Sequence, residues 1–258
     1  MKSREQFLEE VDANGYCVVE DVLSKREVEA LRSALENAIE KEVEYHHGRE
    51  DYVDYAMVML CSLYGGPFIE VFDNPGLIEP LEWVLGEGCI VYAYTSSSMP
   101  PGGTNFSNRI HVDCPRIIPG YETNMGAMVL LDDFTEGNGG SWLLAGSHRS
   151  VEPPAQDDFY ARAERLIAPA GSVNFLHPRL WHAGGDNQTD RWRHSVTMNM
   201  CRPWMKQRID IPRAMSHMDL SGYSEQARQK LGFLAQVPAS YDEYYLPPDQ
   251  RKFRQPVE

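Results

Sequence analysis

The sequence predicts a mainly β domain with flanking helices, and three observations support this fold class. The chain has 258 residues, of which 42% are apolar and 10% aromatic, and this composition is typical of a folded globular protein. The clearest helical periodicity lies before residue 88. From residue 89 onward, short β-like runs alternate with clusters of Gly, Pro, Asn and Asp. An antiparallel barrel or sandwich fits this pattern best.

Two helices are expected in the N-terminal part. The segment Ser24-Lys25-Arg26-Glu27 is a capping box, and apolar residues follow it at helical spacing: Val28, Leu31, Leu35 and Ile39. This pattern predicts a helix over about 24–45. A second helix is predicted over about 75–85, where Gly86 is the stop signal. The run 15–20, before the first helix, is β-like.

The β-like runs after residue 88 are 89–98, 107–113, 125–132, 141–144, 172–176 and 193–202. In the last run, Arg193, Ser195, Thr197 and Asn199 share one face, because side chains alternate along a strand. We expect this polar face to look into a small cavity.

No repeat or linker-like run divides the chain, so the sequence predicts one domain over 1–258. It comprises a helical N-terminal part (about 1–88), a β core (about 89–204) and a helical or irregular C-terminal segment (about 205–258). The C-terminal segment mixes helical pieces such as Ser224–Phe233 with a Tyr/Pro-rich tail, Tyr241–Pro248.

The charge balance disfavours two classes of partner. There are 24 Lys and Arg against 38 Asp and Glu, a formal net charge of −14, which would repel nucleic-acid phosphates and anionic membranes. The five cysteines are scattered and form no C-x-x-C pair, and the N-terminus has no apolar signal-like run. We therefore expect a cytoplasmic protein with reduced thiols that acts on a small molecule, in an oligomeric state that the sequence leaves open.

The pattern His111-Val112-Asp113, with His182 71 residues after His111 and Arg193 eleven residues after His182, predicts a metal site. Residues i and i+2 of a strand point to one side, so His111 and Asp113 can converge on one ion. Two histidines and a carboxylate form the facial triad of non-heme Fe(II) oxygenases, which leaves open coordination positions. A guanidinium beside them can hold the remote carboxylate of a 2-oxo acid cosubstrate.

At this point the chain resembles the phytanoyl-CoA dioxygenase (PhyH-like) family of Fe(II)/2-oxoglutarate-dependent oxygenases, over roughly residues 5–205. Besides the triad and the arginine, the opening segment from Phe7 through Gly15-Tyr16-Cys17 to Leu31 looks like the family's N-terminal pattern. The stretch from Leu131 through Asn138-Gly139-Gly140 to Gly146-Ser147-His148 is similar to another family segment, with Ala145 where the family usually has proline.

The resemblance implies a double-stranded β-helix (jelly-roll, cupin-like) core. It implies Fe(II) bound by His111, Asp113 and His182, 2-oxoglutarate bound by Arg193, and O2 as the oxidant, with release of succinate and CO2. Hydroxylation is expected because family halogenases have a small residue where this chain has Asp113. The expected substrate is a small polar metabolite or a natural-product intermediate.

Further contacts are predicted around this site. Ser195, Tyr94 and Ser96 are expected to contact the cosubstrate. The candidate substrate contacts are Cys114, Arg116, Trp142, Asn174 and Asn199. Four arginines close to the metal residues in sequence are candidates for binding a substrate anion: Arg109, Arg116, Arg179 and Arg202.

Two other functions stay open from the sequence. One is a jelly-roll protein that binds or senses a ligand without catalysis. The other is a cupin-like metalloenzyme that uses zinc or manganese without 2-oxoglutarate; the position of Arg193 argues against it.

Overall fold

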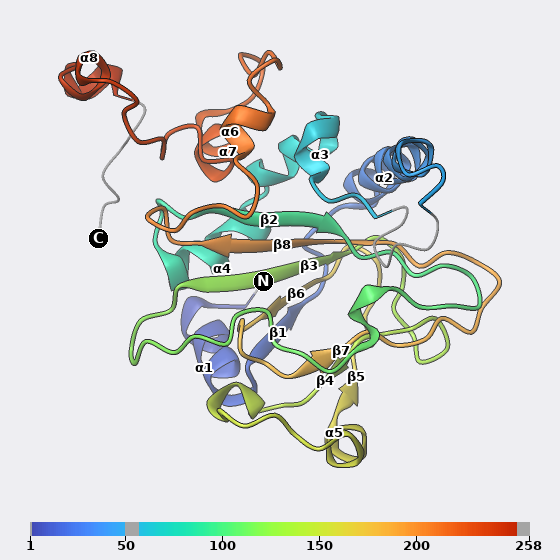
Figure 1. The fold of residues 1–258 in the computed structure, drawn as a ribbon. Coiled ribbons are helices and arrows are strands. Elements are labelled where there is room, and N and C mark those ends of the chain that lie inside the picture. Colours follow the sequence, from blue (N-terminus) through green and yellow to red (C-terminus); the bar gives the residue numbers. More distant parts are fainter. Residues whose placement is uncertain (1, 50–56, 252–258) are drawn as a thin grey trace.

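Two antiparallel sheets with flanking helices make up the fold (Figure 1). The computed structural model describes residues 2–49 and 57–251. The larger sheet has the strand order β1-β6-β3-β8-β2, and the smaller has the order β5-β4-β7. The strands are β1 (Tyr16–Val19), β2 (Ile90–Ser96), β3 (Asn124–Leu130), β4 (Trp142–Leu143), β5 (Glu164–Arg165), β6 (Val173–Leu176), β7 (His182–Ala183) and β8 (Ser195–Cys201).

The helices lie mainly in the N-terminal and C-terminal parts of the chain. They are α1 (Arg4–Asn14), α2 (Lys25–Tyr45), α3 (Pro67–Glu70), α4 (Pro75–Leu85), α5 (Gln156–Arg162), α6 (Ile211–Ala214), α7 (Glu225–Lys230) and α8 (Tyr241–Tyr244). Short 3-10 turns occur at Cys61–Tyr64, Val71–Asp73, Phe106–Asn108, Ser147–Arg149 and Pro248–Gln250. Within the described ranges, no helix has both the length and the apolar character to cross a membrane.

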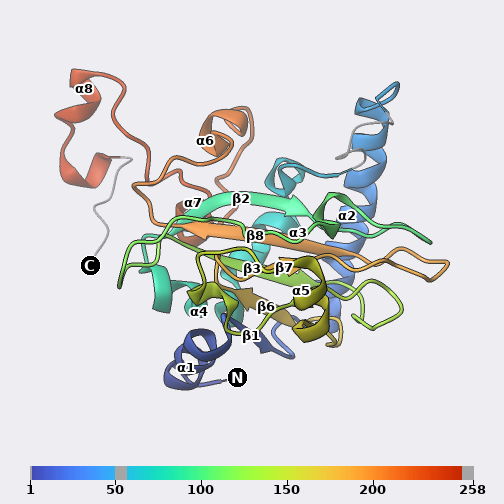
Figure 2. The ribbon, with the colours of Figure 1, turned by 60° about the horizontal axis from the view of Figure 1, so that its bottom comes forward.

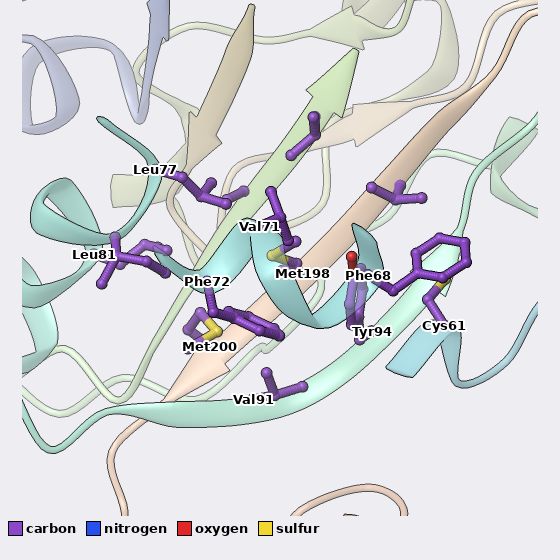
Figure 3. Close-up of a cluster of buried hydrophobic side chains, with 14 of the residues drawn as sticks. Cys61, Phe68, Val71, Phe72, Leu77, Leu81, Val91, Tyr94, Met198 and Met200 are labelled. Carbon is purple, nitrogen blue, oxygen red and sulfur yellow. The ribbon is translucent and has the colours of Figure 1, made fainter. Parts of the chain in front are cut away.

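Side-chain alternation in the larger sheet divides the buried residues into two regions. The main hydrophobic core lies between one face of this sheet and the helices, and Met198 and Met200 of β8 belong to it (Figure 3). The opposite face supplies Met128 and Leu176 to a second cluster, which Leu143 of β4 completes from the smaller sheet. Figure 2 brings the smaller sheet and α5 forward. This two-sheet arrangement confirms the predicted β fold with flanking helices.

The predicted helices over about 24–45 and 75–85 are confirmed as α2 and α4. The capping box of α2 forms as expected: the Glu27 amide donates to Ser24 Oγ, and the Ser24 amide donates to the Glu27 carboxylate. An equivalent box at Ser3 and Gln6 begins α1, a helix that the sequence analysis did not single out.

Five of the six β-like runs contain a strand, and the run 107–113 is the exception. The Asn105 side chain accepts hydrogen bonds from the backbone and hydroxyl of Ser107, and this cap favours the short turn Phe106–Asn108. The prediction of a strand over 107–113 is therefore wrong, apart from an isolated bridge at His111.

The helical N-terminal part also contributes to the sheet, since β1 pairs with β6. The division into about 1–88, 89–204 and 205–258 therefore does not separate helices from strands cleanly. Positions 50–56 and 252–258 of that prediction lie outside the described residues.

Candidate metal centre and its cavity

The three predicted metal ligands converge on one point. Asp113 Oδ1 lies 3.8 Å from His111 Nε2 and 3.9 Å from His182 Nε2. The three ligand atoms lie within 4.8 Å of one another. A backbone bridge fixes the two histidines, because each amide donates to the carbonyl of the other, at 2.9 and 3.0 Å. One ion can contact all three side chains.

The local hydrogen bonds set both imidazoles in the orientation that a metal needs. His111 Nδ1 lies 2.8 Å from the Arg109 carbonyl, and His182 Nδ1 lies 2.9 Å from the Leu180 carbonyl. A carbonyl only accepts, so each Nδ1 carries the proton and each Nε2 keeps its lone pair. Burial and the neighbouring His182 lower the pKa of His111, which favours its neutral form. The donor set therefore fits a divalent metal such as Fe(II).

The triad forms part of the wall of a cavity of about 150 Å³. Strand β8 contributes Thr197 and Asn199 to this wall, and both belong to its predicted polar face. Val196 and Met198 lie on the other face of β8, in the main core. Gly184 also lines the cavity, and a Cβ there would lie 2.5 Å from Ser107 Oγ. The lack of a side chain at this glycine leaves room for the side chains of Ser107 and Met99.

Arg193 is a buried cation beside this cavity. Its side chain donates to the carbonyls of Ser97 and Gly139 and to the hydroxyl of Ser195, each at 3.1–3.2 Å. All three partners are uncharged, Nε has no partner, and the guanidinium lies 4.0 Å from the centre of the Phe134 ring. Burial lowers the pKa of Arg193 to about 9, so the side chain is still charged at neutral pH. An anionic ligand would compensate this buried charge.

The chain matches the sequence model of a known protein family. The sequence model for phytanoyl-CoA dioxygenase (PhyH) matches residues 11–195, a stretch that contains the triad and Arg193. The chain belongs to the phytanoyl-CoA dioxygenase family. The predicted resemblance is therefore confirmed.

Individual relatives agree with this family. The uncharacterized protein Rv1501 of Mycobacterium tuberculosis is 29% identical over 260 residues, which cover 98% of this chain and 95% of that protein. HygX of Streptomyces hygroscopicus, solved with nickel and 2-oxoglutarate bound, superposes with a TM-score of 0.61 at 17% identity, over 80% of this chain and 89% of that one. EctD of S. alaskensis, solved with 2-oxoglutarate and 5-hydroxyectoine, has a TM-score of 0.64 at 18% identity, over 78% and 76%. The fold is the jelly roll of Fe(II)/2-oxoglutarate oxygenases.

Two predicted cosubstrate contacts of the PhyH chain lie on the wrong face of the sheet. Tyr94 is fully buried in the main core, with its ring 6.2 Å from Phe68 and 5.7 Å from Phe72 (Figure 3). The hydroxyl of Ser96 accepts a hydrogen bond from the Val58 amide. The prediction that these two residues contact the cosubstrate is wrong, because β2 presents Ala93 and Thr95 to the cavity instead.

A β-bulge explains this error. The pairing of β2 with β8 shifts between Val91 and Ala93, so Tyr92 is an extra residue that breaks the alternation. Tyr92 lines the cavity although Tyr94, two positions later, does not.

Some of the other predicted contact residues lie at or beside the cavity, and others do not. Asn199 lines the cavity and accepts a hydrogen bond from Asn124, and Ser195 contacts Arg193. Four candidates do not line it: Cys114, Arg116, Trp142 and Asn174. The Cys114 amide is bonded to the Pro178 carbonyl, Arg116 is exposed, and the Trp142 ring packs against the Arg165 guanidinium. Asn174 is buried in the larger sheet, with neither amide atom paired.

Two of the arginines proposed to bind a substrate anion have structural partners. The Arg179 guanidinium donates to the carbonyls of His148, Pro115 and Ser150. The Arg202 guanidinium donates to the carbonyls of Glu122 and Val84. The prediction of anion binding is therefore wrong for these two, because their donors already satisfy backbone acceptors.

Sequence reasoning missed two residues of the cavity wall that lie outside the β core, Met57 and Arg208. Both come from segments without a recognisable motif. The only sequence signal for Arg208 is its position shortly after the last strand.

Proposed function

We propose that this PhyH family member is an Fe(II)- and 2-oxoglutarate-dependent dioxygenase that hydroxylates a small molecule. The observation that carries the proposal is the convergence of His111, Asp113 and His182 on one wall of a cavity. A buried Arg193 beside that cavity supports it.

His111, Asp113 and His182 would hold the metal. When bound, Fe(II) with 2-oxoglutarate and O2 supplies the oxidising chemistry, which yields succinate, CO2 and an oxygenated substrate. The residues of the chain contribute orientation: the Arg109 and Leu180 carbonyls keep both Nε2 lone pairs directed at the common point.

Arg193 would bind the remote carboxylate of 2-oxoglutarate. Its partners are neutral and its Nε is unpaired, so an incoming carboxylate gains a charge-assisted hydrogen bond and neutralises a buried cation. Ser195 holds the guanidinium through its hydroxyl, which in turn donates to the Ser97 carbonyl. Since Ser97 lines the cavity, this network joins the arginine to the cavity wall.

Asp113 favours hydroxylation over halogenation. With a metal bound, its carboxylate would take a position that a halide ligand needs, and its negative charge would oppose a second anion there. Incubation with bromide and a turned-over substrate should therefore give a hydroxylated product and no brominated one, as measured by mass spectrometry.

The test of the metal site is spectroscopic. Anaerobic addition of Fe(II) and 2-oxoglutarate should produce a weak metal-to-ligand charge-transfer band in the visible. His182→Ala should abolish this band, whereas His217→Ala, a change at an exposed histidine of the C-terminal segment, should leave it unchanged. An unchanged band in His182→Ala would refute the site assignment.

Succinate release separates this proposal from the two alternatives. A metalloenzyme that does not use 2-oxoglutarate, and a non-catalytic binding protein, should both release no succinate from 2-oxoglutarate even when iron is bound. Release that depends on iron and O2 would exclude both alternatives.

A further inference from the structure

The rim of the cavity carries a cation that the proposed chemistry does not use. The wall contains apolar side chains such as Met57 and Phe106, the unpaired hydroxyl of Thr197, and the metal triad. Among its described residues, one arginine or lysine is present, Arg208. This arginine is exposed, so it stands where the cavity meets solvent.

The backbone around Arg208 is held in place. Its amide donates to the carbonyl of Tyr92, the bulge residue of β2, at 2.9 Å. The side-chain amide of Gln207, one position earlier, donates to the carbonyls of Val91 and Leu231 at 2.8 and 3.2 Å. The C-terminal segment is thus bound to β2 at Val91 and at the bulge residue Tyr92, and this fixes where the arginine side chain begins.

The guanidinium itself is uncommitted. In the part of the chain that the structure describes, the Arg208 side chain has no hydrogen bond or ion pair. Arg179 and Arg202 differ, because their donors are used by backbone carbonyls. Arg208, a residue of the cavity wall, therefore keeps a full set of unused side-chain donors.

The charges of the cavity favour an anion at this position. Asp113 is the one carboxylate among the described wall residues, and a divalent metal would more than neutralise it. The guanidinium of Arg208 then has no counter-charge in the wall. The planar fork of an arginine matches the geometry of a carboxylate or a phosphate, which it can bind through two parallel hydrogen bonds.

We propose that the substrate carries an oxyanion, a carboxylate or a phosphate, that Arg208 binds at the cavity entrance. The uncharged part of the substrate then extends past Met57 and Phe106 towards the metal triad. This inference rests on the proposed function and adds the chemical class of the substrate. It also explains how a chain of net charge −14 can accept an anion: one local arginine acts against an acidic background.

The test uses the anaerobic protein loaded with Fe(II) and 2-oxoglutarate. Two series of probes, small alkyl and aryl carboxylates and the corresponding phosphate monoesters, are titrated beside their neutral amides and alcohols. Binding is followed by ligand-observed NMR and by the change in the charge-transfer band. One oxyanion series should bind about tenfold or more tightly than its neutral partners. The series that binds tells a carboxylate substrate from a phosphate.

The variant Arg208→Gln should remove that preference, and Arg208→Lys should keep part of it, because a lysine retains the charge without the bidentate fork. Arg213→Gln, at an exposed arginine five residues further on, is the matched control and should behave like the wild type.

Equal binding of oxyanions and neutral partners would overturn the inference, and so would failure of every oxyanion to bind. An oxyanion preference that survives in Arg208→Gln would also overturn it. Absence of the charge-transfer band in the wild type, which is measured before any probe is added, would instead overturn the proposed function on which the inference rests.

Discussion

Strand β8 has seven residues, and its two faces differ in polarity. Val196, Met198 and Met200 face the helices and are fully buried in the main core. Thr197 and Asn199 face the other way and line the cavity. One face is therefore filled with apolar packing, and the other carries polar groups around a void.

Buried polar atoms without a hydrogen-bond partner lie near both faces of the sheet. On the cavity side of the sheet, Arg193 Nε, Thr197 Oγ1 and both amide atoms of Asn174 are buried without a partner, and in the main core the Tyr94 hydroxyl is such an atom. Such groups cost stability unless a ligand or water pairs with them. Residues on the cavity side should thus affect activity more than stability, and residues on the helix side should do the reverse. Four substitutions test this separation.

Asp113→Ala should have the largest effect on activity. Removing one of three metal ligands should lower iron-dependent succinate release by about a thousandfold or more, since a bound metal contributes several kcal/mol to catalysis. The free energy of unfolding of the metal-free protein should change by less than about 1 kcal/mol, because Asp113 is exposed. Asp190→Ala, at a carboxylate with 97% of its side chain exposed, should change neither quantity. A large loss of stability in Asp113→Ala would break the separation of the two faces.

Arg193→Met should chiefly weaken 2-oxoglutarate. Loss of a buried, charged contact costs about 2–5 kcal/mol, which is about 30-fold or more in the KM for 2-oxoglutarate. The cosubstrate should also cease to raise the melting temperature, since it stabilises only a state that binds it. Arg191→Met is the matched control two residues earlier, because that side chain is 91% exposed. An unchanged KM in Arg193→Met would remove the arginine from the cosubstrate site.

The members of the triad could be predicted from residue types at fixed spacing, although His111 lies in an isolated bridge and not in the expected strand. His111 and Asp113 are two residues apart in sequence, and His182, which forms the backbone bridge with His111, follows a family pattern. The polar face of β8 could be predicted because that strand is regular. The contacts of Tyr94 could not, because one extra residue in β2 reverses the alternation and no sequence signal marks it. The place of Arg208 in the cavity wall could not be predicted either, because it depends on the path of a segment without a motif.

Met198→Ala tests the helix-facing side of β8. Truncation of a fully buried methionine leaves a cavity and should lower the free energy of unfolding by about 2–5 kcal/mol. The KM for 2-oxoglutarate should stay within about threefold of the wild type at a temperature where the variant is folded. Chemical denaturation measures the first quantity, and initial rates of succinate release measure the second. Val237→Ala, on an exposed side chain, should lower stability by no more than about 0.5 kcal/mol.

Tyr94→Phe should have the smallest effect, and its sign is the informative part. The Tyr94 hydroxyl is buried in the main core without a partner, and burial raises the pKa of this phenol well above its usual value. Removing an unpaired buried hydroxyl should leave the free energy of unfolding unchanged or raise it by about 1 kcal/mol.

The KM for 2-oxoglutarate should not change in Tyr94→Phe, because the ring contacts Phe68 and Phe72 on the helix side of the sheet. Tyr92→Phe provides the comparison, since Tyr92 lies two residues away on the cavity side and its hydroxyl is not among the unpaired buried atoms. It should bring no gain in stability. A higher KM for 2-oxoglutarate in Tyr94→Phe would mean that β2 has no bulge in solution, and that Tyr94 faces the cavity as simple alternation predicts.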